Sequence, residues 1–95
     1  MAKTAKTAKA GWAIGEAYIL RTVTMILTGR LVAFDDHELW LEDACWIADT
    51  ARWSETLRTG AVCEAEPYPD GFVAVGRGAL VDAATWSAPL PREPK

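Results

Sequence analysis

The chain has 95 residues, enough for one small domain whose core buries only about 60 to 65% of the surface that the unfolded chain exposes. It is 51% hydrophobic and 24% charged and contains five tryptophans, which excludes an intrinsically disordered protein. The net charge is −3, but residues 10–95 alone carry seven basic and thirteen acidic groups. An acidic body lacks the basic face that duplex DNA requires, so DNA binding is not expected.

Segments for export or membrane insertion are not expected either. The longest apolar stretch is interrupted by polar residues, namely Arg21, Thr22, Thr24, Thr28 and Arg30, so no run approaches the length of a membrane span. The lysine-containing N-terminus has no apolar segment behind it of the kind found in a signal peptide, which predicts a cytoplasmic protein. Cys45 and Cys63 are too few for a disulfide scaffold, which leaves subunit association as the expected additional source of stability.

Residues 1–12 are expected to form a disordered, lysine-containing arm. Most of it is the tract AKTAKTAKA, which repeats every three residues and has no apolar face to bury. Its lysines can touch a phosphate backbone, but a solubilising tail or a cloning remnant is the simpler interpretation.

Alternating β-branched and aromatic residues begin at Tyr18 and predict three strands in succession. The first covers about 17–23 and the second about 24–35, with Gly29 inside the second as a bend or a point of close approach. The polar turn FDDHE follows, and alternation resumes in a third strand over about 38–48.

One short helix is predicted after the third strand. Asp49 or Thr50 can cap its beginning, and Gly60 can end it. Trp53 and Leu57 are spaced i, i+4, so they share one face of this helix.

The rest of the chain predicts two further strands and a tail. Residues 61–66 can be extended, PYPDG is a loop, and two apolar runs within 72–86 are separated by Gly-Arg-Gly. Residues 87–95 form a proline-rich tail without core residues. The predicted fold class is therefore mainly β: a single domain over 13–86, built as a small five-stranded, strongly bent open barrel. A short helix is inserted between strands 3 and 4, at about 48–70.

Two stretches together resemble the two motifs of the Sm-like (Sm/LSm) family of RNA-associated ring proteins. The first is GRLVAFD at 29–35, followed by LWLEDA at 39–44: a glycine in a bent strand, a hydrophobic-Asp pair, a short turn and an apolar strand ending in acidic residues. The second is VAVGRGALV at 73–81, in which a strand runs into Arg-Gly and then a last strand. The phage-type branch, with a long insertion between the motifs, resembles the chain best and implies the cytoplasm of a phage-infected host cell.

The resemblance implies a homo-oligomeric ring of about five to seven copies. In that family, the fourth strand of one subunit pairs with the fifth strand of the next, which covers the open edges of the barrel. The seam residues that this implies here are Phe72, Val73, Val75, Leu80 and Val81.

The resemblance also implies a site for single-stranded RNA, U- or A-rich, formed by Asp35, His37, Arg77 and Gly78. His37 would stack on a base, and Arg77 would close the other side of the pocket. Three departures from the family pattern oppose this. The Asn of the turn is absent, the turn is about one residue shorter, and Ala79 replaces a polar residue after Arg-Gly.

Ordinary interpretations of these residues stay open. His37 can be a simple exposed turn residue. Arg77 can pair with Asp82, with Asp35 or with a carboxylate of a neighbouring subunit. The two further carboxylates of the turn would repel a phosphodiester.

Catalysis, a metal site and a cofactor are not expected. The sequence has no Cys-x-x-Cys or His-x-x-x-His pair, and its single His and two Cys have no third orienting group at a known spacing. The alternative to RNA binding is an oligomeric structural or protein-interaction module, of phage type or not, that has no RNA ligand and works through its inserted helix and acidic surface. Trp12 or Trp53 can mark its docking surface, whereas packing in the core or at a subunit seam is expected for Trp40, Trp46 and Trp86.

Overall fold

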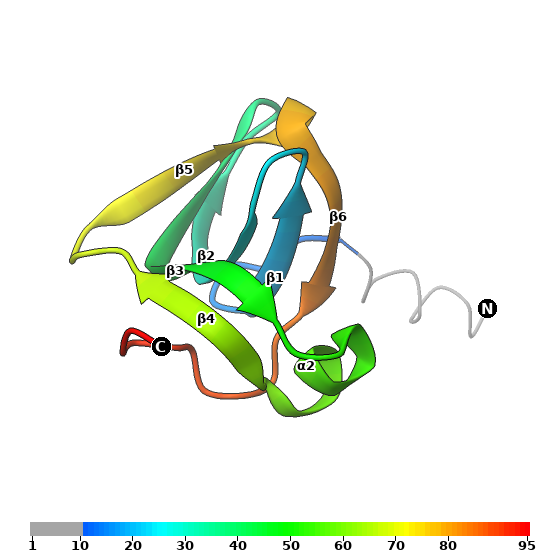
Figure 1. Cartoon of the computed structure of the whole chain (residues 1–95). Coiled ribbons are helices and arrows are strands. Elements are labelled where there is room, and N and C mark those ends of the chain that lie inside the picture. Colours follow the sequence, from blue (N-terminus) through cyan, green and yellow to red (C-terminus); the bar gives the residue numbers. More distant parts are fainter. Residues whose placement is uncertain (1–10) are drawn as a thin grey trace.

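The computed structural model of the chain describes residues 11–95 and is mainly β, with strands over 53% of them (Figure 1). In chain order the elements are β1 (Ala17–Thr22), β2 (Ile26–Phe34), β3 (Glu38–Thr50), α2 (Trp53–Thr59), β4 (Val62–Pro67), β5 (Phe72–Gly76), the 3-10 helix η1 (Arg77–Ala79) and β6 (Leu80–Thr85). The predicted mainly β fold with one short helix after the third strand is confirmed, but there are six strands where five were predicted. The predicted arm lies outside the described residues except for Gly11 and Trp12.

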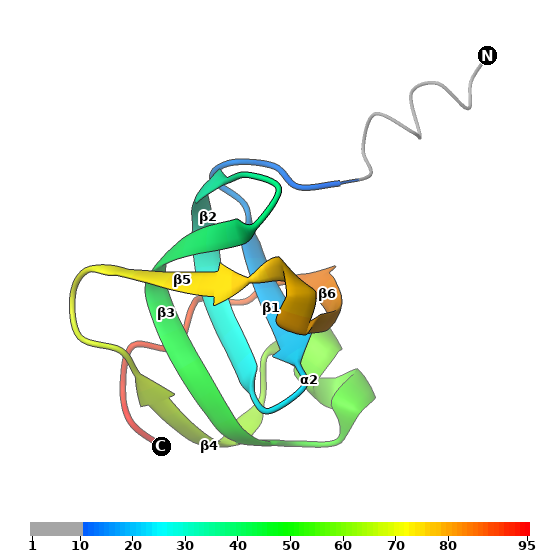
Figure 2. The same cartoon turned by 90° about the horizontal axis from the view of Figure 1, so that it is seen from above.

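The strands form one antiparallel sheet in the order β4-β3-β2-β1-β6, with β5 as an additional partner of β3. The 13-residue β3 explains the extra strand, because residues 38–42 pair with β5 while residues 45–50 pair with β4. The sheet does not close, since within residues 11–95 β5 pairs only with β3 and β6 only with β1. Figure 2 shows β5 continuing through η1 into β6.

The C-terminal segment, residues 87–95, forms hydrogen bonds near the point where β3 changes its partner from β5 to β4. The carbonyl of Ala44 accepts the N–H of Tyr68 (2.9 Å) and a guanidinium N–H of Arg92 (3.1 Å), which also donates to the carbonyl of Tyr68 (3.2 Å). Lys95 then exchanges two main-chain hydrogen bonds with Ala65 of β4 (2.8 and 3.0 Å). The polar groups of this segment thus satisfy carbonyls that the diverging strands leave open. The prediction of a tail without core residues is wrong, because Ala88 and Leu90 pack against a hydrophobic core.

Alternating side chains build two hydrophobic cores on opposite faces of the sheet. In β1, Tyr18 and Leu20 belong to the first core, and Ile19 between them belongs to the second. The buried members of the first core are Tyr18, Leu20, Leu27, Leu31, Leu39, Leu41, Ala44 and Val75. The second core contains Ile19, Cys45, Ile47, Val62, Ala65 and Trp86. The predicted close approach at Gly29 occurs, since a Cβ there would lie 2.9 Å from the Cβ of Leu41.

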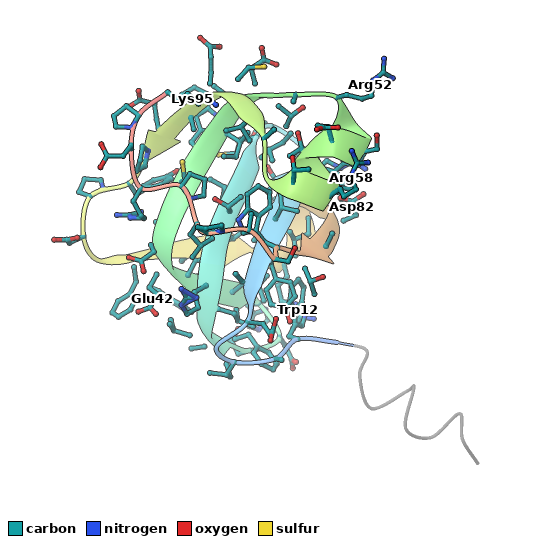
Figure 3. All side chains as sticks on the ribbon, turned by 90° about the horizontal axis from the view of Figure 1, so that it is seen from below. Trp12, Glu42, Arg52, Arg58, Asp82 and Lys95 are labelled. Carbon is teal, nitrogen blue, oxygen red and sulfur yellow. The ribbon has the colours of Figure 1, made fainter. Side chains whose placement is uncertain are left out.

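The inserted helix and the C-terminal segment cover the second core. Trp53 and Leu57 pack against it from the helix face that the sequence predicts, and Ala88 and Leu90 pack against it from the C-terminal segment. In Figure 3 this segment runs across the strands of the sheet. The insertion and the tail therefore act together as one layer of the domain.

The helix begins later than predicted. It starts at Trp53, with Arg52 in the N-cap position and no side-chain cap, because β3 continues through Thr50 and uses the expected cap residues as strand. Arg21 of β1 joins the helix to the sheet: its guanidinium lies 4.7 Å from the centre of the Trp53 ring and donates to the carboxylate of Asp82 (2.8 Å). No helix within residues 11–95 is long and apolar enough to cross a membrane.

The five tryptophans divide into packed and exposed residues. Trp86 is 5% exposed, as predicted, and Trp53 packs on the second core. Trp12 packs on the first core, so it does not belong to a disordered arm. Trp40 and Trp46 are 38% and 40% exposed, so they are not core residues of the single chain, and their packing at a subunit seam stays a prediction.

Candidate functional site

The turn between β2 and β3 is organised by the carboxylate of Asp35. Its Oδ1 accepts the main-chain N–H groups of His37 and Glu38, both at 2.8 Å. The N–H of Asp35 donates to the carbonyl of Glu38 at 3.0 Å and closes the turn. An Asp that bonds the main chain two and three residues on is a standard turn former, so Asp35 has a structural role in the site.

This turn docks on the junction between β5 and β6. The main-chain N–H of Arg77 donates to the carbonyl of His37 (2.9 Å), and Nη1 of the guanidinium donates to the carbonyl of Asp35 (2.5 Å). Gly78 follows in η1 with open space around its Cα. The structure therefore brings together all four residues of the predicted RNA site, although 42 positions separate Asp35 from Arg77.

The contacts of Arg77 within the chain test two of the alternatives left open by the sequence. Its partner is the main-chain carbonyl of Asp35, and Asp82 pairs with Arg21 instead. Only one of the five guanidinium N–H groups is needed for that bond. Pairing of Arg77 with a carboxylate of a neighbouring subunit stays a prediction.

The electrostatics of the site are mixed. Asp36 and His37 are exposed at the tip of the turn, and Glu38 is half-buried beside them. Hydrogen bonds from the main chain of His37 and then of Glu38 hold the pKa of Asp35 below its ordinary value of 3.8, so this carboxylate stays ionised in mildly acidic solution. The single guanidinium of Arg77 thus stands among carboxylates.

In Asp35→Asn, the free energy of unfolding is expected to fall less steeply with pH in acidic solution than it does in wild type. A pKa lowered by folding means that Asp35 contributes stability above pH 3.8, and that this contribution is lost as the pH falls through the lower folded-state value. In urea titrations, the free energy of unfolding of wild type should exceed that of Asp35→Asn at about pH 6, and this difference should shrink below pH 3.8. Asp36→Asn, at the exposed tip of the same turn, is the matched control; an Asp35→Asn gap that does not change with pH would contradict the assignment.

Within residues 11–95 no group of three or more His, Cys, Asp or Glu side chains lies close enough together to hold a metal ion. Both cysteines are free, with Cys45 buried and Cys63 exposed. Burial raises the pKa of the Cys45 thiol, which keeps it protonated near neutral pH.

The residues predicted for a subunit seam fall into two groups. Val75 is buried in the first core of its own chain, and Val73 and Leu80 pack against that core. Phe72 and Val81 are 64% and 62% exposed. Alternation explains the division, because successive residues of a strand point to opposite faces.

Three contacts near these elements were missed by sequence reasoning. Arg92 holds the carbonyls of Ala44 and Tyr68, and Trp12 packs edge-on against Tyr18 with ring centres 5.1 Å apart. Arg21 lies between Trp53 and Asp82. A lone Arg in the proline-rich segment and a lone Trp before the first strand were the only signals available for the first two.

A scan against protein-family models, a search of curated proteins and a search of solved structures each return no match. The function is therefore inferred from the geometry of the site and of the strand edges.

Proposed function

We propose that the chain is an Sm-like subunit that assembles with itself into a ring and binds single-stranded, U- or A-rich RNA at Asp35, His37, Arg77 and Gly78. The observation that carries the proposal is the docking of the β2–β3 turn on Arg77, through the 2.9 Å and 2.5 Å bonds described above. It places the two motifs that resemble the family side by side at one corner of an open antiparallel sheet.

Binding at this corner would rest on stacking. The exposed imidazole of His37 offers a flat face to a base, and the guanidinium of Arg77, held from behind by Asp35, offers a second. Stacking on such groups is worth about 1 to 3 kcal/mol per base and tolerates different bases. If the same site is repeated around a ring, several weak sites can bind one RNA strand together, which raises the overall affinity.

Assembly would rest on the free strand edges. Within the described residues, β5 and β6 each have one hydrogen-bonding edge without a partner. An open edge of unpaired N–H and C=O groups is a template for another strand. Pairing β5 of one copy with β6 of the next is a heterologous contact, which closes into a ring when the rotation permits.

A second candidate is an oligomeric structural or interaction module without RNA. The observation that favours it is the charge of the corner, where the carboxylates of Asp36 and Glu38 lie close to the single guanidinium of Arg77 and would repel a phosphodiester. In this alternative the exposed apolar side chains and the inserted helix would be the working surface.

Binding of short oligo-U and oligo-A at low salt tests the two candidates. His37→Ala removes the exposed imidazole but keeps the main-chain bond to Arg77, so it should weaken binding by about 5- to 150-fold if a base stacks there. Arg77→Ala should weaken it at least as much, and Arg58→Ala on the exposed face of α2 should leave it unchanged. Fluorescence anisotropy gives the affinities; no binding by wild type, or no loss in His37→Ala, would favour the module without RNA.

A further inference from the structure

Two hollows in the surface share the exposed indole of Trp46. The first, of about 250 Å³, is lined by aromatic, proline and acidic side chains: Trp46, Glu66, Pro67, Tyr68 and Pro69. The second, of about 360 Å³, lies where the turn between β1 and β2 meets β3 and is lined by residues 21–22, 24–26 and 46–48. In Figure 2 the second half of β3 runs between β4 and this turn. Together the two hollows form the Trp46 groove, none of whose lining residues belongs to β5 or β6.

The walls of the Trp46 groove are held in place by the rest of the chain. Tyr68 packs against the first core. Its main-chain N–H donates to the carbonyl of Ala44 (2.9 Å), and its carbonyl accepts a guanidinium N–H of Arg92 (3.2 Å). Trp46 lies opposite the buried Leu27 of β2. Walls that are already ordered lose little conformational freedom when a ligand binds, which lowers the cost of binding.

The Trp46 groove is acidic at its β4 end. Glu66 is exposed and lies directly opposite Trp46 in the β3–β4 pair. Glu64 is also exposed and lies on the same side of β4, because residues two apart in a strand share a face. At the other end, the guanidinium of Arg21 is already paired with Asp82. The groove therefore favours a ligand with a positive charge beside Glu66 and would repel a phosphate.

A peptide in this groove has little opportunity to join the sheet as a further strand beside β4. The main-chain N–H and C=O of Ala65 are bonded to Lys95 (3.0 and 2.8 Å), and Pro67 has no N–H to donate. A chain in the polyproline II conformation needs no strand partner. Proline-rich segments in this conformation bind grooves lined by aromatic side chains, and the Trp46 groove has such a lining in Trp46 and Tyr68.

We propose that the Trp46 groove binds a proline-rich peptide in the polyproline II conformation, with a basic residue of the peptide beside Glu66 and its proline rings against Trp46 and Tyr68. Neighbouring strands lie about 4.8 Å apart, so a peptide that crosses from β4 over β3 to β2 spans about 10 Å. Six residues in this conformation extend over about 19 Å, which covers that span. This inference goes beyond the proposed function and does not depend on a ring, since the groove uses neither β5 nor β6.

Binding of fluorescently labelled peptides, measured by anisotropy, tests the proposal. The proline probe has six prolines with an arginine at each end, so a basic residue lies beside Glu66 in either direction of binding. A Gly-Ser control replaces the six prolines by three Gly-Ser pairs and keeps the charge, and an acidic control replaces both arginines by glutamates. We expect wild type to bind the proline probe at least about tenfold more tightly than either control, because a flexible peptide pays to be ordered and an acidic one is repelled.

Two variants test the residues of the groove. Trp46→Ala should weaken binding of the proline probe at least about tenfold, as expected for a central aromatic anchor. Trp40→Ala is its matched control, because Trp40 is 38% exposed on the other half of β3 and lines neither hollow. Glu66→Lys keeps the indole and should reduce the preference for the proline probe over the acidic control at least about threefold. Glu16→Lys, at an exposed position before β1, should leave that preference unchanged.

Several results would overturn the proposal. One is absence of binding of the proline probe by wild type, and another is equal binding of the Gly-Ser control, which would mean that charge alone attracts the peptide. Unchanged binding by folded Trp46→Ala or an unchanged preference in folded Glu66→Lys, with folding checked by circular dichroism, would do the same. A peptide of residues 1–10 that binds more tightly than the proline probe would make that segment the occupant instead. Native mass spectra in which Trp46→Ala loses subunits that wild type retains would assign Trp46 to a subunit seam.

Discussion

Trp86→Ala is expected to lower the free energy of unfolding by about 3 to 5 kcal/mol, as usual for a buried Trp cut back to Ala. The side chain is 5% exposed in the second core, and its Nε1–H donates to the carbonyl of Pro89 at 3.2 Å. Its main-chain N–H donates to the carbonyl of Ala17 at 2.9 Å, so Trp86 also fastens the C-terminal segment to β1. Removing the indole leaves a cavity in the second core and removes the bond to Pro89, while the main-chain bond to Ala17 remains. In a small domain such a loss is a large part of the total stability.

Trp46→Ala is the matched control, because the same side chain is removed from a position that is 40% exposed. It should cost about 2 to 3 kcal/mol, in proportion to the smaller area withdrawn from water. Urea unfolding followed by circular dichroism gives both values. Equal losses for the two variants would show that the layer of helix and C-terminal segment does not form a core.

Much of the sheet could be predicted because period-two alternation was strong. Tyr18, Ile19 and Leu20 lie in β1 as predicted, with their side chains alternating between the two cores. The boundary with β2 was weak because its turn contains no Gly or Asn. The structure shows why none is needed: the Thr22 hydroxyl accepts the N–H of Met25 (3.0 Å) and donates to the carbonyl of Met25 (3.0 Å).

The sixth strand and the C-terminal layer could not be predicted in the same way. The segment VCEAEP has no clear alternation, and it becomes β4 because the second half of β3 supplies a partner. Leu90 and Arg92 stand in a proline-rich run whose local preference is extended and exposed. Their contacts arise only once β4 and β5 have diverged and left carbonyls and apolar surface uncovered.

The candidate site could be predicted in part. Residue types in the turn and in Gly-Arg-Gly singled out Asp35, His37 and Arg77, but no local pattern places positions 42 residues apart in contact. Only the order of the two motifs suggested that they meet. The sequence offers Arg77 the carboxylates of Asp82, of Asp35 or of a neighbouring subunit, and no pattern in it points to the main-chain carbonyl of Asp35 that the guanidinium contacts.

Gly60→Ala is expected to cost about 2 to 4 kcal/mol, since it combines an unfavourable backbone conformation with an overlap. Gly60 ends α2 with φ of 82°, a conformation that favours glycine, and its N–H donates to the carbonyl of Thr56 at 2.8 Å. A Cβ at this position would overlap the Cβ of Ala88 and lie 3.3 Å from Cζ2 of Trp86. The C-terminal segment therefore crosses the helix end where only glycine leaves it room.

Two further variants separate the two causes. Gly15 has φ of 93° and open space around it, so Gly15→Ala should show the backbone penalty alone, about 1 kcal/mol. Adding Ala88→Gly to Gly60→Ala should remove the overlap and regain the stability that it costs. The double-mutant cycle should then give a coupling of about 1 to 3 kcal/mol. Additive losses at positions 60 and 88 would mean that the C-terminal segment does not contact the end of the helix. The second core, which contains Trp86, would then not be covered by this segment.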